Sequence, residues 1–197
     1  MFRVRIYLDY IDPGSFLMDR RLGALEMSME ITVERLPWEV RRPSEPMLAP
    51  SDAAWVGYWT DMARQAREEG FSLVRPDLVP RTRKAHELAL LSREKGYFDK
   101  VHRALMEGFH LQGHDLGRVD VLVELGRAQG LDLTEVKAVL DVDRHAETLD
   151  RIRDEAGALG VRGVPTLVAG PRVLEGVHRV DALREFLIDA QREQQED

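Results

Sequence analysis

Two side chains able to do chemistry, Asp12 and Ser15, lie three residues apart just after an alternating apolar segment. Asp12 stands directly before Pro13, and an Asp followed by Pro is a common helix start, since Asp caps free amides and Pro fits the first turn. One interpretation is therefore an ordinary N-cap with its first helical turn. The alternative is a chemical role, with Asp12 as a general base near Asp9.

The histidines are weaker candidates. His110 and His114 are four residues apart and could share a helix face, but Gly113 interrupts that helix and no carboxylate completes a known metal motif. We therefore predict no metal site. His86 lies on an amphipathic segment, where it either lines a groove or marks the boundary of the buried face.

The absence of cysteine removes several classes of protein. The chain has 197 residues and no Cys. This excludes a disulfide framework, a thiolate metal site, iron–sulfur ligation and a catalytic cysteine. Any function assigned to the chain must use other groups.

Charge and hydropathy argue against nucleic-acid and membrane partners. Lys and Arg number 28 against 35 Asp and Glu, a net charge of −7, and no basic run exceeds two residues. Nucleic-acid binding usually needs a basic stripe, and a membrane span needs about 20 apolar residues. The first residues carry charge where a signal peptide has an apolar run, so we expect a cytoplasmic protein.

Hydrophobic alternation predicts the elements that position Asp12. Apolar residues alternate over 4–8 and again over 29–33, which predicts two strands, with a Leu- and Met-rich helix between them. Strand, helix and strand in so short a stretch form a βαβ unit. Its strands are expected to be parallel, with a right-handed crossover.

A long helical block follows a linker rich in Pro, Ser and Arg at 43–50. Several of its helices end at glycine, as helix C-termini often do. Apolar stripes and end signals predict helices over 55–69, 82–95 (with Thr82 as the N-cap), 98–109, 119–129, 134–140 and 143–159.

The C-terminal part returns to an α/β pattern. Apolar runs at 164–168 and 172–174 flank a Gly-Pro turn and predict a hairpin, and an amphipathic helix follows, with a polar tail over 191–197. We therefore predict an α/β fold. One domain comprises residues 1–45 and 158–197, and a helical insertion domain comprises 46–157.

This layout resembles that of the DsbA-like thioredoxin-fold family. The segment Asp-Tyr-Ile-Asp-Pro-Gly-Ser-Phe at 9–16 resembles the family's strand-to-helix segment, and Gly-Val-Pro-Thr at 163–166 resembles its cis-proline loop. The segments 80–86 and 159–165 are similar to the cytosolic FrnE-like branch. The resemblance implies a thioredoxin-like fold with a large helical insertion, and a cis peptide bond before Pro165.

The resemblance also implies where the redox cysteines of the family would lie in this chain. The family's two redox cysteines map onto Asp12 and Ser15. Thiol–disulfide exchange needs a thiolate, which neither a carboxylate nor a hydroxyl can replace. The resemblance thus implies a member that retains the fold and lacks the dithiol reaction.

A ligand groove is implied as well, because the backbone beside the family's proline pairs with extended peptides or glutathione. Its lining would include Val164, Pro165, His86 and Phe16. We expect a non-redox protein that binds a peptide or a small thiol compound, with glutathione as the cofactor candidate and a homodimer as an open option.

The alternative is a glutathione-dependent isomerase or transferase of the 2-hydroxychromene-2-carboxylate isomerase type. That branch holds the glutathione thiolate at the helix N-terminus with a serine at the first motif position, where this chain has Asp12. A carboxylate there would repel the thiolate, which weighs against the isomerase. Ser15, one turn on, keeps this alternative open.

Overall fold

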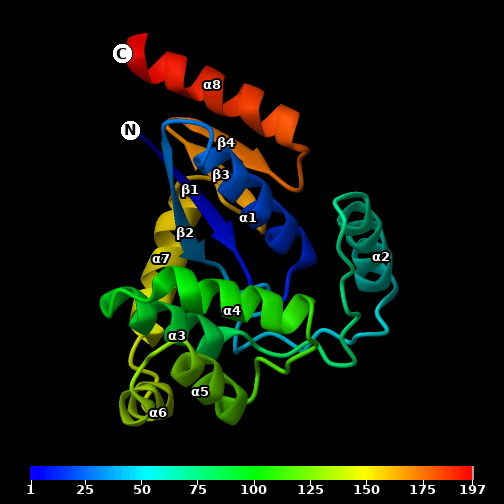
Figure 1. The fold of residues 1–197 in the computed structure, drawn as a ribbon, viewed down its shortest axis with the longest axis vertical. Helices are drawn as coiled ribbons and strands as arrows, with labels where there is room; N and C mark the ends of the chain where they lie inside the picture. The colour runs from blue at the N-terminus through cyan, green and yellow to red at the C-terminus, as the bar shows by residue number, and fades with distance from the viewer. Residues whose placement is uncertain (197) are drawn as a thin grey trace. The chain divides into compact units, whose positions relative to one another are not determined.

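The computed structural model describes residues 1–196. Strands and helices alternate in the first and last parts of the chain, and the stretch between them along the sequence is purely helical (Figure 1). In chain order the elements are β1 (Phe2–Leu8), α1 (Pro13–Glu26), β2 (Ile31–Pro37), α2 (Ala53–Glu68), α3 (Arg83–Glu94), α4 (Phe98–His110), α5 (Val119–Ala128), α6 (Leu133–Asp141), α7 (Ala146–Ala158), β3 (Thr166–Ala169), β4 (Arg172–Glu175) and α8 (Val180–Glu196).

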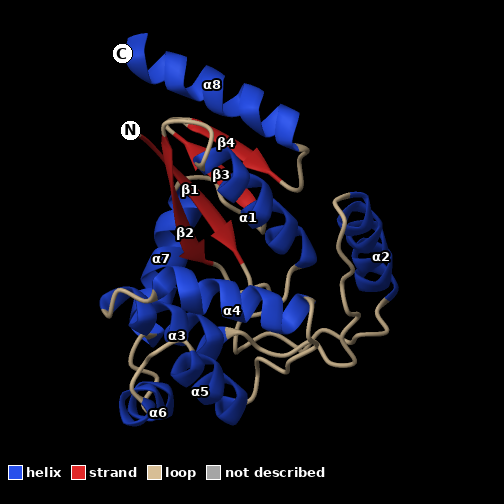
Figure 2. Cartoon of the chain, in the orientation of Figure 1, coloured by secondary structure: helices blue, strands red, loops and turns tan. Residues whose placement is uncertain are grey.

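The strands form a single sheet in the order β2-β1-β3-β4, with α1 packed across it (Figure 2). β1 pairs in parallel with β2, which confirms the predicted βαβ unit, and β3 and β4 form the predicted antiparallel hairpin. β3 also pairs antiparallel with β1, opposing Tyr7 to Thr166. Pro165 therefore lies beside the end of β1, from which the chain enters α1.

Contacts within the chain define two compact units. The sheet unit comprises Met1–Val40 and the chain from Ile152 onward, and the helical unit comprises Arg41–Arg151. The division runs through α7. The domain boundaries expected from the sequence, at 45/46 and 157/158, stay a prediction.

Both faces of the sheet are covered inside the sheet unit. On one face α1 contacts β1 and β2, and α8 contacts α1 and β3. On the other face, residues of β1, β3 and α7 meet the segments that follow β2 and α7. This cluster contains Tyr7, Trp38, Ala156, Val161 and Val168.

The helical unit packs α3 against α4, α5 and α6. One sequence expectation about the helix starts needs correction here, and the N-cap position of Thr82 is confirmed. The last helix of the block, α7, begins at Ala146 and not at residue 143, because Asp143 has a φ of 50°, which is incompatible with a right-handed helix. Thr82 stands at the N-cap of α3, but its side chain makes no capping hydrogen bond.

Two findings concern the chain as a whole. No helix among residues 1–196 has both the length and the apolar character to cross a membrane. The polar segment expected after residue 190 continues α8 to Glu196, and Asp197 lies outside the described residues.

Candidate functional site

Asp12 is the N-cap of α1, which confirms the capping interpretation of its sequence. Its backbone is extended, and its carboxylate Oδ2 accepts a hydrogen bond from the Ser15 N–H at 2.6 Å. The Ser15 hydroxyl donates to the same oxygen at 2.6 Å and accepts from the Asp9 N–H at 3.2 Å. The hydroxyl thus ties the first turn of α1 to the end of β1.

The start of α1 is buried. Asp12 is 3% exposed, and Ser15 and Asp9 are fully buried. The Asp9 carboxylate accepts from the Val40 N–H at 2.6 Å, so the two carboxylates bind different donors. Buried polar groups of this kind need partners, and here the Ser15 N–H and hydroxyl and the Val40 N–H supply them.

The loop before β3 lies at the same end of the sheet. The Val164–Pro165 peptide bond is cis. The Pro165 carbonyl accepts from the Gly176 N–H at 2.8 Å, and the Thr166 hydroxyl donates to the Gly163 carbonyl at 2.8 Å. These bonds connect the loop to the hairpin and fix its course.

Val164 differs from its neighbours in the loop. Its side chain packs against the cluster that contains Tyr7 and Trp38, so its position is anchored. Among residues 1–196, however, no hydrogen bond uses its backbone N–H or C=O. The residue is only partly buried. It therefore offers one donor and one acceptor, as the edge of a β-strand does.

The remaining predicted groove residues are buried side chains. Phe16 is 2% exposed on α1, with the Arg20 guanidinium 5.7 Å from its ring centroid. His86 is 1% exposed on α3, in the helical unit. The sheet unit thus brings together Asp12, Ser15 and Pro165. The role of each predicted residue in binding stays a prediction.

The pair of histidines considered as metal ligands lies in the helical unit. His110 is fully buried and stacks on Trp59, with the ring centroids 5.7 Å apart. Nowhere in residues 1–196 do three or more His, Asp or Glu side chains cluster as metal ligands would. Stacking gives His110 a packing role.

Sequence reasoning missed a buried polar cluster at the start of α7. The Glu87 carboxylate, fully buried on α3, accepts from the His145 N–H at 3.2 Å and lies 3.6 Å from the Lys84 ammonium. Burial raises the pKa of Glu87, and burial lowers the pKa of His145. Lys84 also pairs with Asp143 at 2.6 Å. The cluster fixes the turn that leads into α7.

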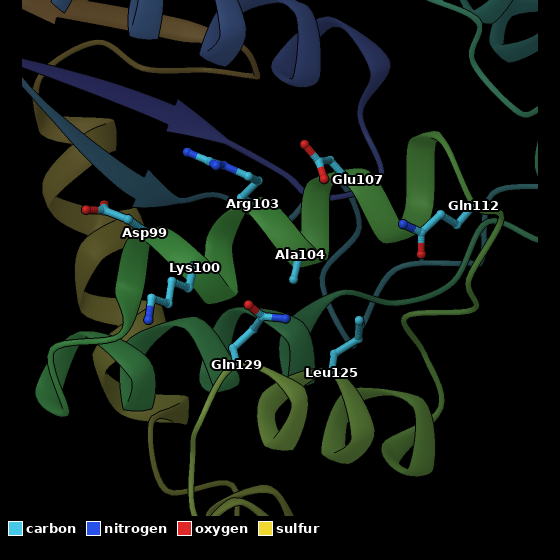
Figure 3. Close-up of a pocket in the computed structure, with 8 residues that line it drawn as sticks. All are labelled: Asp99, Lys100, Arg103, Ala104, Glu107, Gln112, Leu125 and Gln129. Carbon is cyan, nitrogen blue, oxygen red and sulfur yellow. The ribbon is translucent and has the colours of Figure 1, made fainter.

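A cavity of about 310 Å³ in the helical unit was also missed (Figure 3). Residues on and just after α4 and α5 line it, and their charges have both signs: Asp99 and Glu107 against Lys100 and Arg103. Most of these charged side chains are exposed. The cavity has neither a dominant charge nor a buried polar group that would define a ligand.

Comparison with known proteins identifies the family. The DSBA-like thioredoxin domain matches residues 3–188. The Bacillus subtilis protein YwbO, described as uncharacterized, is 24% identical over 197 residues, covering 96% of this chain and 97% of YwbO.

Solved structures share the fold. A probable DsbA oxidoreductase from Streptomyces coelicolor superposes with a TM-score of 0.82 at 24% identity, covering 97% of this chain and 90% of its own. A 2-hydroxychromene-2-carboxylate isomerase gives 0.82 at 19% identity, covering 98% of both chains. The predicted thioredoxin-like α/β fold with a helical insertion is confirmed. The chain belongs to the DSBA-like thioredoxin domain family, as a member without cysteine.

Proposed function

We propose that this protein binds an extended peptide, or a small thiol compound of peptide character, along the backbone of Val164 without any redox step. The ligand backbone pairs with Val164, in the loop before β3, as two neighbouring strands pair. The main-chain hydrogen bonds supply affinity, and neighbouring side chains supply selectivity.

The observation that carries this proposal is the free hydrogen-bonding capacity of Val164. Its side chain packs against the core, whereas its N–H and C=O have no partner among residues 1–196. Most backbone groups in folded proteins are paired, and a partly buried residue with both groups open is suited to a ligand backbone. Because the chain has no cysteine, disulfide exchange is not available at this loop, and we propose binding as its use.

A glutathione-dependent isomerase is less well supported by the same site. Such an enzyme needs a hydroxyl or a base free to act on the bound thiol. The fully buried Ser15 hydroxyl instead donates to Asp12 and accepts from the Asp9 N–H. Turnover of 2-hydroxychromene-2-carboxylate in the presence of glutathione would favour the isomerase over the binding protein.

The test is a titration of isotope-labelled protein with S-methylglutathione and with an uncharged extended tripeptide, followed by amide chemical shifts. Saturable shifts centred on residues 163–166 are expected at micromolar to millimolar ligand. The matched control is the same tripeptide with its central amide N-methylated, which cannot pair with a strand edge. We expect it to bind at least about tenfold more weakly, the equivalent of one lost hydrogen bond.

Two results would contradict the proposal. One is the absence of any saturable shift with millimolar tripeptide and millimolar S-methylglutathione. The other is equal affinity for the tripeptide and its N-methylated analogue, which would mean that the ligand backbone does not pair with the protein.

A further inference from the structure

We propose that Asp12 sets the charge of the ligand: the site accepts a neutral sulfur or an apolar group beside α1 and rejects a thiolate or a carboxylate. This inference rests on the proposed function, because it describes the chemistry of a ligand held at Val164. It assigns Asp12 a selective role in addition to its capping role.

The register of the sheet places the start of α1 close to the Val164 backbone, where the ligand is proposed to bind. The register opposes Tyr7 to Thr166, so the Val164–Pro165 bond lies next to the residues that follow β1. The Ser15 hydroxyl bonds to the Asp9 N–H, which brings the Asp12 carboxylate to the same end of the strand. Val164 and the start of α1 are thus neighbours within the sheet unit.

The start of α1 is already occupied by an anion. A helix N-terminus attracts negative groups through its free N–H donors and its dipole. Here the Asp12 Oδ2 atom takes both the Ser15 N–H and the Ser15 hydroxyl, each at 2.6 Å. Pro13 has no N–H to offer. The Ser15 N–H and the Ser15 hydroxyl, which could otherwise hold a ligand thiolate, are therefore already used by the Asp12 side chain.

Burial makes the charge of Asp12 effective against a second anion. Repulsion between like charges is several times stronger near a protein interior than in bulk water. Asp12 is 3% exposed, so little water lies around its carboxylate to screen that repulsion. A neutral thiol, thioether or apolar side chain meets no such penalty.

The experiment compares two ligands that differ in one charge. Glutathione is mostly thiolate at about pH 9.5 and mostly thiol at about pH 7, whereas S-methylglutathione has no ionisable sulfur. For the wild-type protein we expect the ratio of glutathione Kd to S-methylglutathione Kd to rise about tenfold between these pH values. In the Asp12→Asn variant the ratio should stay level or fall, since Asn keeps the cap and removes the charge.

The matched control is Asp132→Asn, because Asp132 caps α6 in the same way and is exposed. It should behave as wild type does. Asp12→Ser is a second uncharged variant with a good capping side chain, in case the Asn variant fails to fold.

The outcomes separate this inference from the proposed function. Suppose that the wild-type protein binds S-methylglutathione and that the ratio of the two Kd values changes with pH in Asp12→Asn and Asp12→Ser as it does in wild type. The proposed role of Asp12 would then be wrong, and the proposed function would still stand. If the wild-type protein binds neither compound nor the uncharged tripeptide, both proposals fail. A ratio that rises with pH in the wild type and in Asp132→Asn, but not in the two Asp12 variants, supports the inference.

Discussion

Two helices of this protein begin in the same way and end up in different surroundings. α1 begins at Asp12, whose carboxylate accepts from the Ser15 N–H at 2.6 Å, and α6 begins at Asp132, whose carboxylate accepts from the Glu135 N–H at 2.9 Å. Asp12 is 3% exposed, whereas Asp132 is exposed. Only Asp12 receives a second hydrogen bond, from a hydroxyl three residues on.

The comparison shows that capping by itself does not make a site. Both aspartates satisfy a helix N-terminus, and a local sequence pattern predicts both. What distinguishes α1 is its place at the end of β1, near the loop that holds Val164, where we propose that a ligand binds. The variants that follow should affect the two helix starts differently.

The largest difference between the starts of α1 and α6 is expected when cysteines replace Asp12 and Ser15. Asp12→Cys with Ser15→Cys should create insulin-reducing activity in the presence of dithiothreitol, at least about tenfold above background. The reason is that a helix N-terminus lowers a thiol pKa, and that the start of α1 lies near the Val164 backbone, where we propose that a peptide binds.

Asp132→Cys with Glu135→Cys has the same spacing at the start of α6 and should stay at background. A folded Asp12/Ser15 double-cysteine variant without activity would mean that these positions do not correspond to the cysteines of the family.

A smaller difference between the two helix starts is expected in the free energy of unfolding. Asp12→Ala removes a cap and leaves the buried Ser15 hydroxyl and amide without their acceptor, so it should cost about 2–3 kcal/mol. Asp132→Ala removes an exposed cap and should cost about 0.5–1 kcal/mol. Urea unfolding of the two variants beside wild type measures both values. Equal losses would show that burial adds nothing to the role of Asp12.

The start of a third helix, α7, adds a comparison in which stability depends on pH. α7 is approached by the Glu87 carboxylate of α3, which accepts from the His145 N–H. Burial raises the pKa of Glu87 above its usual 4.5, so the folded protein keeps this proton at pH values where the unfolded chain has lost it. The contribution of Glu87 to the free energy of unfolding is therefore complete below about pH 4.5. It is lost as the pH rises through the pKa that Glu87 has in the folded protein.

Glu87→Gln keeps an acceptor for that N–H and removes the titration. The variant should gain in stability relative to wild type as the pH rises from about 4.5, by at most about 1.4 kcal/mol per pH unit. His145, whose pKa burial lowers, titrates in both proteins, so its contribution largely cancels in the difference. A difference that is flat from about pH 4 to pH 8 would contradict the account of Glu87.

The sequence was sufficient for the elements and for the start of α1. Alternating residues such as Val4 and Ile6 mark β1, and the Asp-Pro pair at 12–13 marks the cap, because both are local patterns that tertiary packing here reinforces. The family resemblance then predicted the fold and the helical insertion.

What escaped prediction depends on contacts between distant segments. Glu87 and His145 are 58 residues apart in the chain, and no local pattern links them. The positive φ of Asp143, which delays the start of α7, is equally invisible in a hydrophobic periodicity. The open backbone of Val164 has no local sequence signal either, and the sequence pointed to it only through the family resemblance of the segment 163–166.

The most direct test of the central claim is hydrogen exchange at the Val164 amide. The N–H has no partner among residues 1–196, so in the free protein we expect it to exchange much faster than the amides of β3. Saturating S-methylglutathione or the uncharged tripeptide should slow it at least about tenfold. If the Val164 amide is already protected in the free protein, or if saturating ligand leaves its exchange unchanged, the proposal that the ligand binds to the Val164 backbone is contradicted.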